Sequence, residues 1–228
     1  MKLFVIEGVD GSGKSTQLKL LKKFIIAKGY DFEFLHFPRT DAPYFGELIA
    51  RFLRGEFGTL NEVDPYLVAL LYAGDRKDAA EKINSWLEKK KIVLLDRYTY
   101  SNIAYQCAKL YDHKSQDRLM KWILSLEFTH FAIPRPDLNF FLDVPFSFTE
   151  KKLQSNRSGD DRDYLNGTKD IHEESLNFQK KVRDIYLRVA RSDKRLVVVN
   201  CCTKDGSMQS PEEISQLILK IISDRKLI

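Results

Sequence analysis

The sequence contains little cysteine, with Cys107, Cys201 and Cys202 the only three among 228 residues. None of them belongs to a C-x-x-C pair, so the pattern argues against both a disulfide framework and a structural zinc site. No apolar run approaches the ~20 residues that a membrane-spanning helix needs. No signal-peptide pattern precedes the first apolar segment, Leu3–Ile6. We therefore expect a cytoplasmic protein that has no membrane partner.

A strong excess of charge of one sign is also missing. The chain has 37 Lys and Arg against 32 Asp and Glu, a formal net charge of +5. This small excess suits anionic ligands but does not indicate nucleic-acid binding. The length suits one α/β domain over residues 1–228 with a sizeable core.

Short apolar runs alternate with helical patterns along the whole chain. Such runs are typical of central parallel strands, so the alternation predicts an α/β fold: a five-stranded parallel sheet with helices on both faces. The expected strands are Leu3–Ile6, Phe32–Phe37, Ile92–Leu95, Leu138–Leu142 and Leu196–Val199. The expected helices follow Gly13 up to Gly29, then cover 44–53, 64–91 with a possible break, 101–110, 115–126, 148–156, 171–190 and 211–222. The polar segment 157–169 predicts a mobile surface lid.

The strongest local signal is a phosphate-binding loop between the first strand and the first helix. Residues 8–15 match G-x-x-x-x-G-K-[ST] in the strand–loop–helix context that this motif requires, which predicts the P-loop NTPase fold. Glycines let backbone N–H groups approach phosphate oxygens at a helix N-terminus. Lys14 is expected to reach the β- and γ-phosphates, and Ser15 to bind Mg²⁺. The expected ATP-binding residues are Gly8, Asp10, Gly11, Ser12, Gly13, Lys14, Ser15 and Thr16.

Two motifs that are missing from the chain reduce the number of P-loop protein classes that it fits. No N-K-x-D motif for reading guanine is present, so a switch GTPase is disfavoured. The strand Ile92–Leu95 ends in Asp96-Arg97, where a motor ATPase usually carries an acidic pair. A second positive charge beside the phosphates suits an enzyme that holds two anionic substrates.

Several motifs in order resemble the thymidylate kinases, a family of nucleoside-monophosphate kinases. They include the segments 6–17, Phe37-Pro38-Arg39, Asp75-Arg76, Asp96-Arg97-Tyr98 and Pro134-Arg135-Pro136-Asp137. The resemblance covers nearly the whole chain. It implies transfer of the γ-phosphate of ATP to dTMP, giving dTDP and ADP for dTTP and DNA precursor synthesis. It also implies Mg²⁺ as cofactor and a homodimer.

The resemblance assigns roles around the acceptor nucleotide. Asp10 would accept a hydrogen bond from the 3′-hydroxyl of dTMP, and Arg39 and Arg97 would hold its phosphate, since a guanidinium grips phosphate oxygens in pairs. The other dTMP contacts implied are Tyr72 stacked on thymine, Arg76 and Asn102 on its polar edge, Tyr105 against the sugar 2′ position, and Tyr164 over the closed site.

The chain differs from some thymidylate kinases in where the positive charge for catalysis comes from. Some relatives carry a basic residue inside the phosphate-binding loop, where this chain has the uncharged Gly11 and Ser12. Phosphoryl transfer needs positive charge around the transferred group. We therefore expect Arg157 or Arg162 of the lid to act in catalysis with Lys14 and Arg97. Mg²⁺ would be held by Ser15 and, through water, by Asp96.

Other classes of nucleotide-binding protein also fit the phosphate-binding loop. A kinase acting on dUMP, UMP or a deoxynucleoside would share everything except the base and sugar contacts. A P-loop ATPase that binds nucleic acid or a protein, and a degenerate kinase fold that only binds nucleotide, are further classes. The intact Lys14-Ser15 and Asp96-Arg97 pairs disfavour the last of these.

Overall fold

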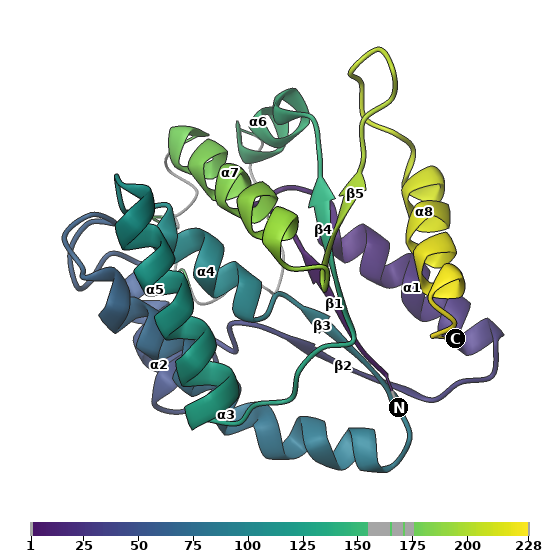
Figure 1. Cartoon of the computed structure of the whole chain (residues 1–228), viewed down its shortest axis with the longest axis horizontal. Helices are drawn as coiled ribbons and strands as arrows, with labels where there is room; N and C mark the ends of the chain where they lie inside the picture. The colour runs from purple at the N-terminus through teal and green to yellow at the C-terminus, as the bar shows by residue number, and fades with distance from the viewer. Residues whose placement is uncertain (1, 155–164, 166–170, 172–175, 228) are drawn as a thin grey trace.

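The computed structural model describes residues 2–154, Leu165, Ile171 and 176–227 (Figure 1). Its centre is one parallel sheet of five strands in the order β2-β3-β1-β4-β5, which confirms the expected α/β architecture. The strands are β1 (Lys2–Glu7), β2 (Phe32–His36), β3 (Ile92–Asp96), β4 (Leu138–Asp143) and β5 (Leu196–Asn200).

Helices cover both faces of this sheet. In Figure 1, α1 and α8 lie together on one side, while α3, α4, α5 and α7 lie on the other. The bounds are α1 (Lys14–Ala27), α2 (Phe45–Leu53), α3 (Pro65–Glu88), α4 (Thr99–Cys107), α5 (His113–Ser125), the π-helical turn η1 (Leu126–His130), α6 (Phe146–Gln154), α7 (Leu176–Ser192) and α8 (Pro211–Asp224).

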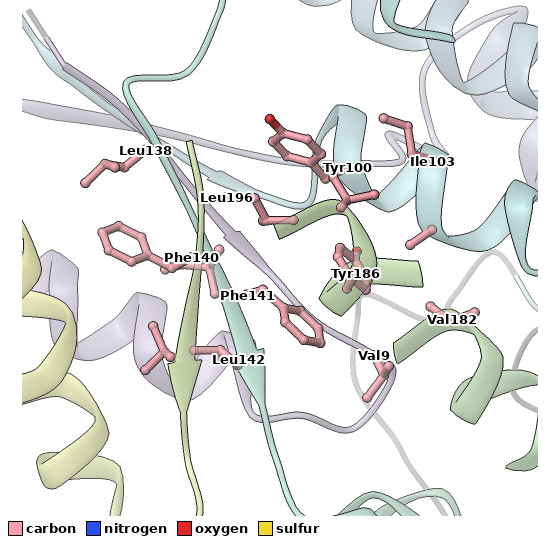
Figure 2. Close-up of a cluster of buried hydrophobic side chains, with 14 of the residues drawn as sticks. Val9, Tyr100, Ile103, Leu138, Phe140, Phe141, Leu142, Val182, Tyr186 and Leu196 are labelled. Atoms are coloured by element: carbon pink, nitrogen blue, oxygen red, sulfur yellow. The ribbon is translucent and has the colours of Figure 1, made fainter. Parts of the chain in front are cut away.

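The core forms because the central strands are apolar on both faces. Phe140, Phe141 and Leu142 of β4 are at most 1% exposed. Figure 2 shows these side chains beside Tyr186 of α7, whose ring stacks on Phe141 at a centroid distance of 4.4 Å. Burial of this kind contributes roughly 25 cal/mol per Å² of apolar surface and holds the strand ends in fixed positions.

Helix α3 runs unbroken over 24 residues, so the break that the sequence allowed is not present. Asp64 caps its start by accepting from the backbone N–H of Tyr66 at 2.8 Å, and Pro65 occupies the first turn. The helix ends at Glu88, before the expected Lys91.

Helices α5 and α7 also differ in their bounds from the helices that the sequence predicts. Asp112 caps α5 through Ser115 N–H, so this helix begins at His113 and not at Ser115. The described part of α7 begins at Leu176 and ends at Ser192.

All three cysteines carry free thiols. None of the helices in the described part of the chain combines the length and the apolar character that crossing a bilayer requires.

Candidate active site

The phosphate-binding loop joins the end of β1 to the start of α1. Gly11 and Gly13 have φ angles of 75° and 84°, left-handed conformations that glycine adopts without strain. Lys14 is buried, and its Nζ donates to the carbonyl oxygens of Val9 at 3.1 Å and Gly8 at 3.4 Å. The ammonium group therefore lies over the loop, where backbone N–H groups and the helix N-terminus favour phosphate.

Arg97 lies directly after β3 in an unusual backbone conformation. Its φ angle is 64°, which is uncommon for a residue other than glycine and marks stored strain of the kind found at functional sites. Its backbone N–H donates to the carbonyl oxygen of Ile6 at 3.0 Å. Its Nη1 donates to the carbonyl of Gly8 at 2.9 Å and to Ser101 Oγ at 3.3 Å. The guanidinium thus crosses the carboxyl end of β1, where open α/β sheets bind ligands.

Asp10 contacts three side chains that are distant from it in the sequence. Its carboxylate accepts from Arg97 Nη2 at 2.6 Å, from the Tyr105 hydroxyl at 2.7 Å and from Gln179 Nε2 at 3.0 Å. Burial raises the pKa of Tyr105, and the charge of Asp10 adds to this rise although Arg97 opposes it. The phenol therefore remains a donor. The structure brings together Asp10, Arg97 and Tyr105, three of the residues that the sequence predicts to bind the acceptor nucleotide.

Asp96 provides a buried carboxylate beside the loop. Burial acts to raise its pKa, but the hydrogen bond from His36 and the charges of Lys14 and Arg97 outweigh it and hold the pKa below its usual value. Its Oδ2 lies 3.3 Å from His36 Nδ1, while the buried Oδ1 has no hydrogen-bond partner among the described residues. Ser15 has an exposed side chain at the start of α1. An ionised carboxylate with an unused oxygen suits a hydrated Mg²⁺ ion, which prefers oxygen ligands, and the exposed Ser15 hydroxyl is a second oxygen of this kind.

Arg39 is held in place by two carboxylates of α3. Its Nε donates to Asp75 Oδ1 at 2.8 Å, and its Nη2 donates to Asp78 Oδ2 at 2.6 Å. The backbone N–H of Arg39 also donates to Asp75 Oδ2 at 3.0 Å. Burial acts to lower the pKa of Arg39, and the bonds to Asp78 and Asp75 more than reverse this effect. Asp75 therefore positions both the backbone and the guanidinium of Arg39.

The residues expected to read the base surround a carboxylate that the sequence did not single out. Arg76 is 1% exposed, and its Nε and Nη2 donate to Glu127 at 2.6 and 2.7 Å. Asn102 Nδ2 donates to Glu127 Oε1 at 3.0 Å and to the carbonyl of Ala69 at 3.0 Å. Thr99 Oγ1 donates to Glu127 Oε2 at 2.8 Å. Arg76 and Asn102 therefore share one rigid, buried network.

Tyr72 lies one helical turn before Arg76 on α3, as the i, i+4 spacing predicts. Its half-buried ring packs against an apolar cluster that contains Phe52 of α2 and Val68 of α3. Arg157, Arg162 and Tyr164 lie outside the described residues, so their expected roles in the lid stay predictions.

Three residues that contact the site were not predicted from the sequence. Glu7 is fully buried at the end of β1 and accepts from Ser101 and Tyr186. Gln179 reaches Asp10 from α7, and Glu127 reaches Arg76 from η1. Glu7 is visible in the sequence as a charged residue that ends an apolar run. Gln179 and Glu127 lie in ordinary helical patterns that carry no such signal.

A parallel sheet with a phosphate-binding loop at its carboxyl edge defines a protein of the P-loop nucleotide-binding class. Residues 6–210 match the sequence profile of the thymidylate kinase family. This match spans well over half of the chain. The chain therefore belongs to the thymidylate kinase family.

Individual relatives agree with this assignment. The chain is 32% identical over 223 residues to a probable thymidylate kinase of Thermococcus kodakarensis, covering 96% of this chain and 95% of that protein. It is 30% identical over 188 residues to the thymidylate kinase of Mycobacterium tuberculosis, covering 82% and 85%. The solved structure of thymidylate kinase from Candida albicans is similar with a TM-score of 0.72 and 26% identity, covering 99% of this chain and 92% of that chain.

Proposed function

We propose that this chain transfers the γ-phosphate of ATP to dTMP, giving dTDP and ADP for the synthesis of dTTP and DNA precursors. The observation that carries the proposal is the convergence of Asp10, Arg97 and Tyr105 beside the phosphate-binding loop. The loop supports binding of the donor triphosphate. The adjoining arginine and carboxylate suit a second substrate that has a phosphate and a sugar hydroxyl.

The transfer is proposed to proceed in line, and it needs no general base because the acceptor phosphate is already anionic. Lys14 stabilises charge on the donor phosphates. Arg97 stabilises charge shared between donor and acceptor, while Asp75 and Asp78 hold Arg39 for the dTMP phosphate. Arg157 and Arg162 are proposed as the further cations. The protein thus acts by positioning and electrostatic stabilisation.

Mg²⁺ would be held by the Ser15 hydroxyl and, through water, by Asp96, and it would neutralise charge on the β- and γ-phosphates. The burial of Asp96 and its depressed pKa support this role, since the carboxylate remains ionised.

The acceptor base is proposed to stack on Tyr72 and to bond with Arg76 and Asn102. Asn102 Oδ1 is buried and has no hydrogen-bond partner among the described residues, so it can accept from the N3–H of thymine. The Arg76 guanidinium can donate to O4 of the base. Tyr105 would exclude a 2′-hydroxyl, and Tyr164 would close over the nucleotide.

The assembly is proposed to be a homodimer in the cytoplasm. On α3, Leu67 is 61% exposed and Leu70 is 38% exposed, a pair of large apolar side chains on one helix. A second copy of this chain packed against α3 would bury them. Sedimentation of the purified protein as a monomer across micromolar concentrations would contradict this part of the proposal.

The reaction is tested by incubating the protein with ATP, Mg²⁺ and a panel of acceptors: dTMP, dUMP, UMP, CMP, dCMP, dGMP and thymidine. We expect diphosphate formation to be fastest with dTMP. Preference for another monophosphate would keep the transfer mechanism and reject the base pocket. Hydrolysis of ATP without any phosphorylated acceptor would reject the kinase function.

A further inference from the structure

Glu127 is the centre of the network behind the base-reading residues. Its side chain has no solvent exposure. Oε2 accepts from Arg76 Nε and Thr99 Oγ1, and Oε1 accepts from Arg76 Nη2 and Asn102 Nδ2, all within 2.6–3.0 Å. A carboxylate has about four lone-pair sites, so the acceptor capacity of Glu127 is full. Each neighbour must therefore present a donor to it.

This requirement fixes the orientation of the Asn102 amide. Nδ2 faces two acceptors, Glu127 Oε1 and the carbonyl of Ala69, each at 3.0 Å. Turning the amide over would place Oδ1 against both acceptors and leave them unsatisfied in a buried site. Hydrogen-bond partners decide which end of an amide is oxygen. The oxygen of Asn102 must therefore face away from Glu127.

The same carboxylate fixes how Arg76 is presented. Glu127 engages the edge of the guanidinium formed by Nε and Nη2, and the group lies over the Tyr98 ring at 5.9 Å from its centroid. Nη1 donates to none of the described residues. Because the guanidinium is planar and rigid, this pairing determines the direction of the remaining N–H groups. Arg76 thus keeps a donor that Glu127 does not use, and Asn102 keeps an acceptor that Glu127 does not use.

The position of Glu127 depends on a local irregularity of the chain. It lies in η1, where the N–H of Phe131 donates to the carbonyl of Leu126 at 2.8 Å, a spacing of five residues. The extra residue in this turn distinguishes it from the α-helix α5 that precedes it. Single π-helical turns occur frequently at functional sites.

We propose that Glu127 is a positioning residue that sets the donor–acceptor polarity of the base pocket and so selects thymine over cytosine. The inference rests on the proposed function, in which Arg76 and Asn102 contact the base. Thymine presents an acceptor at O4 and a donor at N3. Cytosine presents a donor at N4 and an acceptor at N3, so it opposes both residues with like groups.

The substitution Glu127→Gln tests this role because it keeps the shape of the side chain. If the new amide nitrogen takes the place of Oε1, it faces Nη2 of Arg76 and Nδ2 of Asn102. If it takes the place of Oε2, it faces Nε of Arg76. Either orientation sets a donor against Arg76. We expect kcat/KM for dTMP relative to dCMP to fall at least about tenfold, one missing or opposed hydrogen bond.

The KM values separate positioning from general damage. We expect KM for dTMP to rise while KM for ATP stays unchanged, because the altered contacts lie at the acceptor base. Asp193→Asn is the matched control, since Asp193 accepts from Tyr100 of the same helix α4 and from Arg195. This control must keep the wild-type ratio of dTMP to dCMP.

Two different results separate the role of Glu127 from the kinase reaction itself. A wild-type protein that does not phosphorylate dTMP rejects the proposed function. A wild-type protein that prefers dTMP, together with an unchanged ratio in folded Glu127→Gln, overturns the role of Glu127 even if its thermal stability is lower.

Loss of the buried counter-charge of Arg76 can also prevent folding of the variant. In that case the test uses the wild-type enzyme and compares its affinity for dTMP with its affinity for N3-methyl-dTMP. We expect the methyl group to weaken binding at least tenfold, because Glu127 orients Asn102 so that its Oδ1 is the acceptor for N3–H. Equal binding would overturn the proposal.

Discussion

Nη2 of Arg97 lies 2.6 Å from Oδ1 of Asp10 and joins the end of β3 to the phosphate-binding loop. Burial acts to lower the pKa of Arg97, but the neighbouring Tyr105 and Asp10 raise it well above its usual value. Arg97 therefore stays charged throughout the working pH range. The pair places one cation and one carboxylate where acceptor phosphate and sugar are proposed to bind.

Arg97→Ala is expected to lower kcat about 10²–10³-fold, the usual effect of removing one preorganised donor from a transition state. The substitution also removes the ion pair between Arg97 and Asp10. Arg97→Lys should restore little activity, since a single ammonium cannot reach Gly8, Asp10 and phosphate together. Steady-state assays with varied ATP and dTMP measure the effect.

Arg195→Ala provides the matched control for this prediction. Arg195 pairs with Asp193 on the surface and contacts none of the residues assigned to the site. Its removal should leave kcat within about twofold, since exposed ion pairs contribute little. A raised KM for dTMP with unchanged kcat in Arg97→Ala would mean that Arg97 binds ground state and transition state equally.

The ring and the hydroxyl of Tyr105 are expected to have different roles, which two substitutions can distinguish. Tyr105→Ala removes the ring and should allow ribonucleotide acceptors, raising kcat/KM for UMP relative to dUMP. Tyr105→Phe keeps the ring but loses the 2.7 Å bond to Asp10, so it should keep the sugar preference while kcat/KM for dTMP falls about tenfold.

The test is a comparison of dUMP and UMP as acceptors for the wild type and both variants. An unchanged sugar preference in Tyr105→Ala would show that the ring packs in the core and does not contact the sugar. A changed preference in Tyr105→Phe would assign sugar selection to the hydroxyl and Asp10.

The sequence alone predicts the sheet and the phosphate-binding loop because both depend on local patterns. Lys14 follows from a contiguous motif, and the five strands follow from short apolar runs. The position of Arg97 also follows, because the carboxyl ends of parallel strands meet at one edge. What these features share is that a local stretch of sequence is enough to predict where they lie.

Contacts between distant segments were not predictable in this way. Glu127 lies 51 residues from Arg76, and Gln179 lies 169 residues from Asp10. Each sits in a helical pattern in which a polar residue is ordinarily solvated. The π-helical turn that directs Glu127 inward has no composition signature. Burial of these carboxylates and amides becomes visible only when the helices are packed.

Gly74 of α3 is expected to be intolerant of a larger side chain. A Cβ at this position would lie 2.2 Å from Cε1 of Phe45, the first residue of α2. Gly74→Ala gains about 1 kcal/mol of helix propensity, but the overlap should more than reverse the gain and cost a net ~1–3 kcal/mol. Thermal and urea unfolding measure the change in free energy of unfolding.

The double variant Gly74→Ala with Phe45→Ala tests the cause. Removing the ring relieves the overlap, so Gly74→Ala should be neutral or stabilising when it is added to Phe45→Ala. An equal loss of stability in both backgrounds would place the strain in the α3 backbone and contradict the prediction.

Lys109 is expected to lower stability at neutral pH. Its Nζ is buried without a hydrogen-bond partner among the described residues and lies 4.7 Å from the Phe52 ring centroid. Burial lowers the pKa of Lys109 to about 7, with Asp64 offsetting part of the effect. The unfolded chain keeps a lysine pKa of about 10.4.

Between these two values the unfolded state binds more protons, so the contribution of Lys109 makes stability rise as pH rises from about 7 towards about 10. Below about 7 both states are protonated, and the full cost of burying the charge remains. Lys109→Met removes the charge at similar volume and should stabilise the protein by about 1–3 kcal/mol at pH 6.

Urea unfolding of the wild type and Lys109→Met at pH 6, 7.5 and 9 checks this prediction. The difference in free energy of unfolding should be largest at pH 6 and shrink by pH 9, because neutral lysine no longer carries the burial cost. Lys220→Met, at an exposed position of α8, should show no such trend. If this difference in free energy of unfolding did not change with pH, Met would stabilise the protein for reasons unrelated to charge. Lys109 would then be either neutral or fully solvated at pH 6, and the prediction would be wrong.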